Sequence, residues 1–179
     1  MKSQRCLTDI KTLRERARQH IENGAATRGY KVNRETIIKL LNEALATEII
    51  CVLRYGRHHF MASGLNARSV AQKFLRHWKE EQIHADQIAR RIIQIGGEPD
   101  FSLEGLLIRN HTEYVQGVTL IGMIEEDLIA ERMGIEGYRE MIAYLAGDDT
   151  TTRRMLEEIL VIEEKHAEDL ASLLTELGS

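Results

Sequence analysis

The chain has 179 residues, of which 43% are hydrophobic and 29% charged, a composition typical of a folded globular protein and not of a disordered one. The net charge of −4 conceals an asymmetry, because residues 1–32 carry eight basic and three acidic side chains (+5) and the remainder carries −9. No apolar run approaches the roughly 20 residues that span a bilayer, and the N-terminus lacks the apolar core of a signal peptide. We therefore expect a cytoplasmic protein without a membrane partner. Two cysteines, Cys6 and Cys51, are too few for a disulfide framework or a four-thiolate metal site.

Helical periodicity dominates the chain, and Pro99 is its one proline, so the predicted fold class is all-α. Residues 8–23 predict a short amphipathic helix that ends before Gly24. Four longer helices are predicted over 34–63, 66–95, 112–146 and 150–177, with Asn33 as an N-cap and Gly64 and Gly147 in turns. Residues 97–110 form an irregular connection that contains the apolar piece "LEGLL". Helices of about 30 residues are about 45 Å long, which favours a four-helix bundle over residues 33–179, preceded by a basic extension over residues 1–32.

The apolar face of each long helix is interrupted by acid at one level. The second and fourth long helices each carry a Glu and a His three residues apart on that face, within "EEQIHADQI" and "EEKHAEDL", and the first and third each carry a single Glu. The six residues are Glu48, Glu81, His84, Glu131, Glu163 and His166.

The spacing predicts that these levels coincide. In an antiparallel hairpin, residues at equal height lie equally far from the turn; Glu48 and Glu81 are centred on residue 64.5, and Glu131 and Glu163 on residue 147. A crossover of about 14 residues reaches roughly 45–50 Å when extended, which lets the second and third long helices run parallel. All six side chains would then lie in one layer.

Four carboxylates and two imidazoles buried together would repel one another and lose their hydration without cations. Two divalent metal ions would neutralise them, and oxygen and nitrogen ligands without thiolate suit iron or manganese. One Glu from each of two helices and Glu-x-x-His from the other two is the ligand pattern of ferritin-like di-iron carboxylate bundles. The sequence therefore predicts an all-α, ferritin-like four-helix bundle with a long crossover between its second and third helices.

The sequence does not assign metal binding to the other polar residues near this face. His77 faces the same seam and is interpreted as a satisfied histidine of the core or surface, and His58, His59 and His111 as surface residues. Tyr55, seven residues after Glu48, either packs in the core or, at a redox site, hydrogen-bonds a ligand or donates an electron. Cys51 is interpreted as a buried, inert thiol. The acids Glu125, Glu126 and Asp127 are assigned to a solvated face.

The sequence resembles bacterioferritin and its relatives over about residues 37–174, in "ATEIICVLRY", "EEQIHADQIARRI", "DLIAERMGIEGYREMIAYL" and "EEKHAEDL". The resemblance implies that Glu48 and His84 hold one iron, that Glu131 and His166 hold the other, and that Glu81 and Glu163 bridge them. It implies a ferroxidase with two iron ions per subunit, for which manganese or zinc could substitute. Such a site oxidises Fe(II) with dioxygen or hydrogen peroxide, for iron storage and protection from oxidative stress, and Tyr55 would belong to its catalytic residues.

Two departures from bacterioferritin refine this expectation. Gln82 stands where the family places its haem-binding methionine, so haem is not expected. Only 13 residues follow His166, too few for a fifth helix, and an N-terminal extension is present instead. This combination resembles the Dps-like mini-ferritins, some of which keep a bacterioferritin-type site within each bundle, and implies a homo-oligomeric shell of twelve subunits rather than 24.

Two alternatives remain open. One is a di-iron oxidase or peroxidase that acts as a small oligomer without storing mineral. The other is a protective DNA-binding protein that places its basic N-terminus on phosphates, through residues such as Arg5, Lys11 and Arg14. The apolar stripe among these basic residues favours docking onto a neighbouring subunit over DNA binding.

Overall fold

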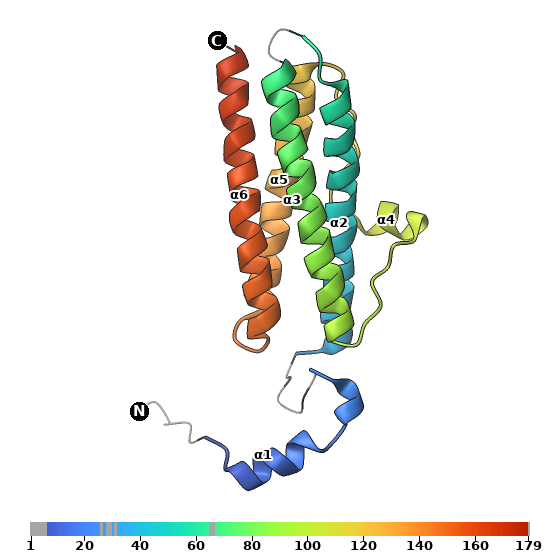
Figure 1. Ribbon diagram of the computed structural model, residues 1–179, viewed down its shortest axis with the longest axis vertical. Coiled ribbons are helices and arrows are strands. Elements are labelled where there is room, and N and C mark those ends of the chain that lie inside the picture. Colours follow the sequence, from blue (N-terminus) through green and yellow to red (C-terminus); the bar gives the residue numbers. More distant parts are fainter. Residues whose placement is uncertain (1–6, 26, 28–29, 31, 65–66, 179) are drawn as a thin grey trace.

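The computed structural model describes residues 7–25, 27, 30, 32–64 and 67–178 (Figure 1). Within them the chain forms helices and no strand. The elements are α1 (Ile10–Ala17), the 3₁₀ helix η1 (Ile21–Asn23), α2 (Arg34–Met61), α3 (Ala67–Gln94), α4 (Leu103–Arg109), α5 (Leu120–Leu145) and α6 (Thr150–Gly178). Arg5 and Cys6 lie outside the described residues.

The four long helices form a bundle of two antiparallel hairpins, α2 with α3 and α5 with α6 (Figure 1). The hairpins meet where α2 packs on α5 and α3 on α6. Because the crossover over residues 95–119 returns the chain along the bundle, α3 and α5 run in the same direction, as predicted. The all-α four-helix bundle with a long crossover is thereby confirmed. In the part of the chain that is described, no helix is both long and apolar enough to cross a membrane.

The helix ends follow local chemistry. The Asn33 side chain accepts a hydrogen bond from the Thr36 N–H at 3.0 Å, which is the predicted N-cap of α2. At the end of α3, Gly96 has a φ of +78°, and the Gly97 N–H bonds the carbonyl of Ile92 at 2.9 Å. This is the Schellman arrangement, in which glycine supplies the left-handed residue that ends a helix.

The third long helix begins at Leu120, so the prediction of a start near residue 112 was wrong. Side chains of α2 bind the backbone before it: the Arg54 guanidinium donates to the carbonyl of Glu113 at 3.3 Å, and the His58 Nε2 lies 2.8 Å from the carbonyl of Gln116. These contacts hold the backbone of residues 113–116 against α2, ahead of the first turn of the helix.

A glycine and a cap then place the first turn of α5. Gly117 has a φ of +58°, and a Cβ at this position would lie 2.7 Å from the backbone of Met123. Two residues later, the Thr119 side chain accepts a hydrogen bond from the Gly122 N–H at 3.0 Å. Both features require the chain to enter α5 at residue 120.

The N-terminal segment is less helical than predicted. In place of one helix over 8–23 the chain forms α1 and η1, because His20 between them adopts a left-handed backbone with a φ of +54°. Figure 1 shows α1 beyond the end of the bundle, and none of its residues is buried. Its apolar side chains Ile10 and Leu13 are 67% and 51% exposed. An apolar stripe left in water is a candidate for contact with another molecule.

The apolar core has two parts. One, which contains Leu41, Leu45 and Ile92, fills the bundle toward the start of α2; the other, which contains Phe74 and Leu170, fills it toward the end of α2. Charged side chains, buried at the same level in all four helices, separate the two parts.

Candidate metal centre

A layer of six buried polar side chains crosses the middle of the bundle. We call it the polar layer; its members are Glu48 of α2, Glu81 and His84 of α3, Glu131 of α5, and Glu163 and His166 of α6. Each exposes 4% of its surface or less. The structure thus brings together all six residues that the sequence placed at one height.

The polar layer divides into two overlapping sets of ligand atoms. One set comes from Glu48, Glu81, His84 and Glu163, the other from Glu81, Glu131, Glu163 and His166, and within each set the atoms lie within 4.8 Å of one another. Glu81 and Glu163 belong to both. A pair of carboxylates shared between two such sets is the arrangement that two bridged metal ions require.

Several nitrogen and oxygen atoms of the polar layer lie close together but have no hydrogen-bond partner. The His84 Nδ1 lies 2.7 Å from Glu163 Oε1, 3.4 Å from Glu48 Oε2 and 3.6 Å from Glu81 Oε2, yet it has no partner in hydrogen-bond geometry. One oxygen of each of the four glutamates is likewise buried without a hydrogen bond. Buried polar atoms are rarely left unpaired, so a cluster of them aimed at common points fits bound cations.

Two tyrosines hold the glutamates that belong to only one set. The Tyr55 hydroxyl of α2 donates to Glu131 Oε1 on α5, and the Tyr138 hydroxyl of α5 donates to Glu48 Oε1 on α2. The hydrogen bond of Tyr55 is one of the roles that the sequence left open for it. The role of Tyr138 was missed, although it stands seven residues after Glu131, as Tyr55 stands seven after Glu48.

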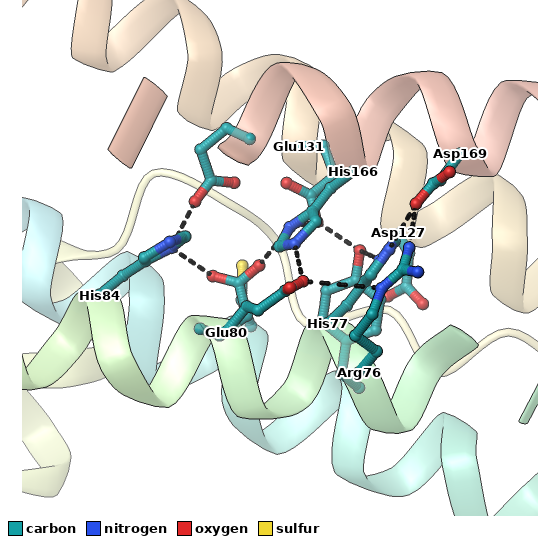
Figure 2. A network of polar contacts seen from close by, with 12 residues as sticks. Arg76, His77, Glu80, His84, Asp127, Glu131, His166 and Asp169 are labelled. Atoms are coloured by element: carbon teal, nitrogen blue, oxygen red, sulfur yellow. Dashed lines mark hydrogen bonds and ion pairs between the residues drawn. The ribbon is translucent and has the colours of Figure 1, made fainter. Parts of the chain in front are cut away.

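The His166 ring makes polar contacts through both of its nitrogens, one toward the polar layer and one toward Glu80. Its Nδ1 lies 3.1 Å from Glu81 Oε1 and 3.5 Å from Glu131 Oε1, while its Nε2 lies 2.7 Å from Glu80 Oε2. Figure 2 shows His166 between Glu80 and Glu131. Because an ionised carboxylate only accepts, the Nε2 carries a proton, so Nδ1 is the nitrogen that would bind a metal ion once its own proton is displaced. His77 stacks on His166 with 3.9 Å between ring centroids.

His77, Glu80 and His166 also bring ligand atoms within 4.8 Å of one another. Since the His166 Nε2–H is used on Glu80, we interpret this trio as support for His166 and not as a separate metal site. His77 is a satisfied core histidine, as the sequence suggested: its Nδ1 lies 3.2 Å from the Tyr55 hydroxyl and its Nε2 lies 3.5 Å from Asp169 Oδ2. Nothing in the local pattern of the sequence marked Glu80, which lies off the apolar seam.

A family model described as "Ferritin-like domain" matches residues 38–178, most of the chain. The chain belongs to the ferritin-like family. Among curated relatives, the ferritin-like chain is 28% identical to a bacterioferritin of Desulfovibrio desulfuricans over 146 residues, which are 79% of this chain and 78% of the relative. It is 32% identical to a nutrient stress-induced DNA-binding protein of Nostoc over 137 residues, 75% of this chain and 74% of the relative.

Solved structures agree with this family. The ferritin-like bundle superposes on a dodecameric thioferritin, the bacterioferritin-related protein of Bacteroides fragilis, with a TM-score of 0.80 and 28% identity. The superposition covers 83% of this chain and 89% of that one. A Dps protein of Thermosynechococcus elongatus gives a TM-score of 0.74 at 22% identity, with 78% and 90% of the two chains covered, which shows the shared fold.

Without metal, the polar layer of this ferritin-like protein retains protons. Burial, and then the charge of Glu81, raise the pKa of Glu48 to about 8, and the same two causes raise the pKa of Glu163 well above its usual range. Burial alone would lower the pKa of His84 and His166, but contacts with the carboxylates outweigh it and raise both pKa values to about 10. Cations that bind here must therefore displace protons.

Two assignments of residues to the surface of the ferritin-like bundle were wrong. His58 and Asp127 are fully buried, with the His58 Nδ1 2.8 Å from Asp127 Oδ2, and Arg54 donates to Asp127 Oδ1 at 2.8 Å. This group ties α2 to α5 and to the crossover. A charged side chain on a helix looks the same in sequence whether it faces water or a buried partner on another helix. Cys51 is buried, as expected, and burial raises the pKa of its thiol well above the usual value.

Proposed function

We propose that this protein is a ferroxidase that oxidises Fe(II) with dioxygen or hydrogen peroxide at a di-iron carboxylate site in each bundle. The observation that carries the proposal is the sharing of Glu81 and Glu163 between two sets of converging ligand atoms. Glu48 and His84 would complete one metal position, and Glu131 and His166 the other. Hard carboxylate oxygens with one imidazole nitrogen per position suit iron, and manganese or zinc would bind as substitutes.

The side chains around the site would act by holding its ligands. Tyr55 and Tyr138 fix the terminal glutamates, and Glu80 fixes the ring of His166. Glu48, Glu163, His84 and His166 would give up their protons as Fe(II) binds, so binding weakens as the pH falls. The role of Tyr55 as an electron donor is also part of the proposal. Two Fe(II) ions bound side by side could each supply one electron to a shared oxidant.

The direct test is an Fe(II) titration of the metal-free protein with dioxygen or peroxide, followed by electron microscopy. We expect rapid oxidation at two Fe(II) per subunit and then growth of a mineral core. The Glu163→Ala variant, which lacks one shared carboxylate, is the matched control and should oxidise iron at the buffer rate. Oxidation by the parent protein no faster than buffer would refute the proposal; oxidation without a mineral core would favour the small-oligomer oxidase.

We propose further that twelve subunits form a shell. The exposed apolar surface supports association: Leu103, Leu107 and Ile108 of α4 are 79%, 70% and 82% exposed, and α4 projects from the side of the bundle in Figure 1. The apolar stripe of α1, in which no residue is buried, would dock on a neighbour. Native mass spectrometry should find about twelve times 20.5 kDa, and deletion of residues 1–24 should weaken the assembly. A 24-subunit species that survives the deletion would contradict both statements.

DNA binding is a second candidate, which one observation favours. The basic side chains Lys11, Arg14, Arg16 and Arg18 are all exposed on and after α1, beyond the end of the bundle (Figure 1). Relatives named for DNA protection or DNA binding align with this chain at 30% and 32% identity. A gel shift that weakens with salt and disappears on deletion of residues 1–20 would support this function; identical shifts with and without the segment would exclude it as the cause.

A further inference from the structure

The two halves of the polar layer differ in the surroundings of their histidines, His84 and His166. The His166 side chain is fully buried: Glu80 binds its Nε2 at 2.7 Å, and His77 covers one face of its ring. Both nitrogens of His166 are thus engaged, one with the polar layer and one with Glu80. A ligand histidine held at its second nitrogen keeps its orientation.

His84 instead reaches a cleft. A cavity of about 310 Å³ opens between α3 and α6, and its walls include His84, Ile83 and Gln87 of α3 and Glu158 and Ile162 of α6. Glu80, the partner of His166, lies on the same wall. In Figure 2, His84 stands at one end of the network and Asp169 at the other. His166 contacts Glu80 and stacks on His77, and His77 in turn contacts Asp169.

The cleft is lined by isoleucine side chains, with acid side chains among them. Glu158 exposes 62% of its side chain, where it pairs with Arg154 at 3.0 Å, and Glu80 exposes 30%. At the inner end, the His84 Nδ1 lies 2.7 Å from Glu163 and 3.4 Å from Glu48.

We propose that the two metal positions exchange at different rates, because only one of them faces this cleft. The position formed by Glu48 and His84, which we call the cleft position, gains and loses its ion through the opening between α3 and α6. The position formed by Glu131 and His166, the closed position, keeps its ion longer. Glu80 is the positioning residue that closes it, by fixing His166. This inference rests on the proposed function, since it assumes that the polar layer binds two ions.

The test uses Co(II) as a probe that reports binding by its visible absorbance. Protein loaded with Co(II) under anaerobic conditions is mixed with excess EDTA, and the loss of absorbance is followed. We expect two phases of equal amplitude, one ion per subunit in each. Ile83→Trp should narrow the cleft and slow the fast phase. Ile129→Trp is the matched control, because Ile83 and Ile129 are 54% and 53% exposed, and it should leave both phases unchanged.

Variants of Glu80 test the closed position. Glu80→Ala frees the His166 Nε2 and should accelerate the slow phase by about 10- to 100-fold. The fast phase should change much less, although Glu80 also lines the cleft. Glu80→Gln keeps an acceptor for the Nε2–H and should restore most of the slow release. A purely structural role for Glu80 would instead move both phases together or neither, and either result would overturn this assignment.

The outcomes separate this inference from the proposed function. If fewer than two Co(II) ions bind per subunit, the di-metal site itself is wrong. If two ions bind but leave in a single phase that Ile83→Trp does not slow, the site stands and the difference between the two positions is overturned.

Discussion

Tyr138 of α5 donates a hydrogen bond to Glu48 of α2, across the bundle. The reverse contact also exists, since Tyr55 of α2 donates to Glu131 of α5. Each tyrosine stands two helical turns after the glutamate of its own helix, so α2 and α5 exchange equivalent contacts. With Glu-x-x-His on both α3 and α6, the site has an approximate two-fold symmetry in its ligands. The symmetry does not extend beyond these residues, because Glu80 binds the Nε2 of His166, whereas His84 borders a cleft.

Removing the hydroxyl of Tyr138 should weaken metal binding. In Tyr138→Phe, Glu48 loses the donor that orients it, and loss of such a supporting contact costs about 10- to 100-fold in metal affinity. A Co(II) titration measures the effect. Tyr144→Phe, at a residue 52% exposed, is the control and should bind as the parent does; equal affinity in both variants would contradict the role given to Tyr138.

Glu81→Ala should abolish paired-metal binding and leave a folded bundle. Glu81 contributes to both sets of ligand atoms, so its loss affects both positions. Removal of a buried carboxylate from a crowded cluster can stabilise the metal-free protein. Metal content and circular dichroism check the two statements, and a variant that still binds two ions per subunit would show that Glu81 does not bridge.

The metal-free protein should lose stability as the pH rises from about 6.5 toward 10. The pKa of His84 and His166 is raised to about 10, so their protonation stabilises the fold fully below the unfolded value of about 6.5 and is lost above it. Glu48, with a pKa of about 8, also favours the protonated native state and adds to the decline. Urea midpoints at pH 6 and pH 9 measure this. Zinc should restore the midpoint at pH 9; a metal-free midpoint that is higher at pH 9 than at pH 6 would contradict the prediction.

Asp127→Ala should destabilise the bundle by about 3–5 kcal/mol, because it leaves the buried Arg54 guanidinium without its counter-charge. Urea unfolding gives the free energy. Glu125→Ala, two residues earlier on an exposed position, should change the free energy of unfolding by less than about 0.5 kcal/mol. Similar values for the two variants would mean that the buried ion pair contributes little.

Protein produced with excess haem should show no stoichiometric Soret band. Gln82 carries no thioether, and its side-chain amide lies 3.2 Å from Asp86 Oδ1 on the helix surface. Absorbance spectra of the purified protein check this. A stoichiometric band would point to Met61, Met123 or Met133 as an axial ligand that the sequence did not suggest.

The polar layer could be predicted from the sequence because it depends on regular geometry. An α-helix repeats every 3.6 residues, so Glu81 and His84 had to share a face, as Glu163 and His166 did. A hairpin has two arms of equal length, so the turn at Gly64 set the height of Glu48 against Glu81. The helical repeat and the equal arms of a hairpin apply within one helix or one hairpin. There the relative position of two residues follows from their residue numbers alone.

The tertiary structure decided what depends on a neighbour from another helix. Residue number does not reveal that Glu80 lies beside His166 or that His58 and Asp127 are buried together. Nor does it reveal that α2 binds the carbonyl of Gln116 and that α5 begins only at Leu120. The rotation of each helix about its axis and the path of the crossover set these contacts, and both follow from packing across the whole bundle. For this protein the six residues of the polar layer could therefore be predicted from spacing, whereas the contacts that support them and their access to solvent became apparent only in the folded chain.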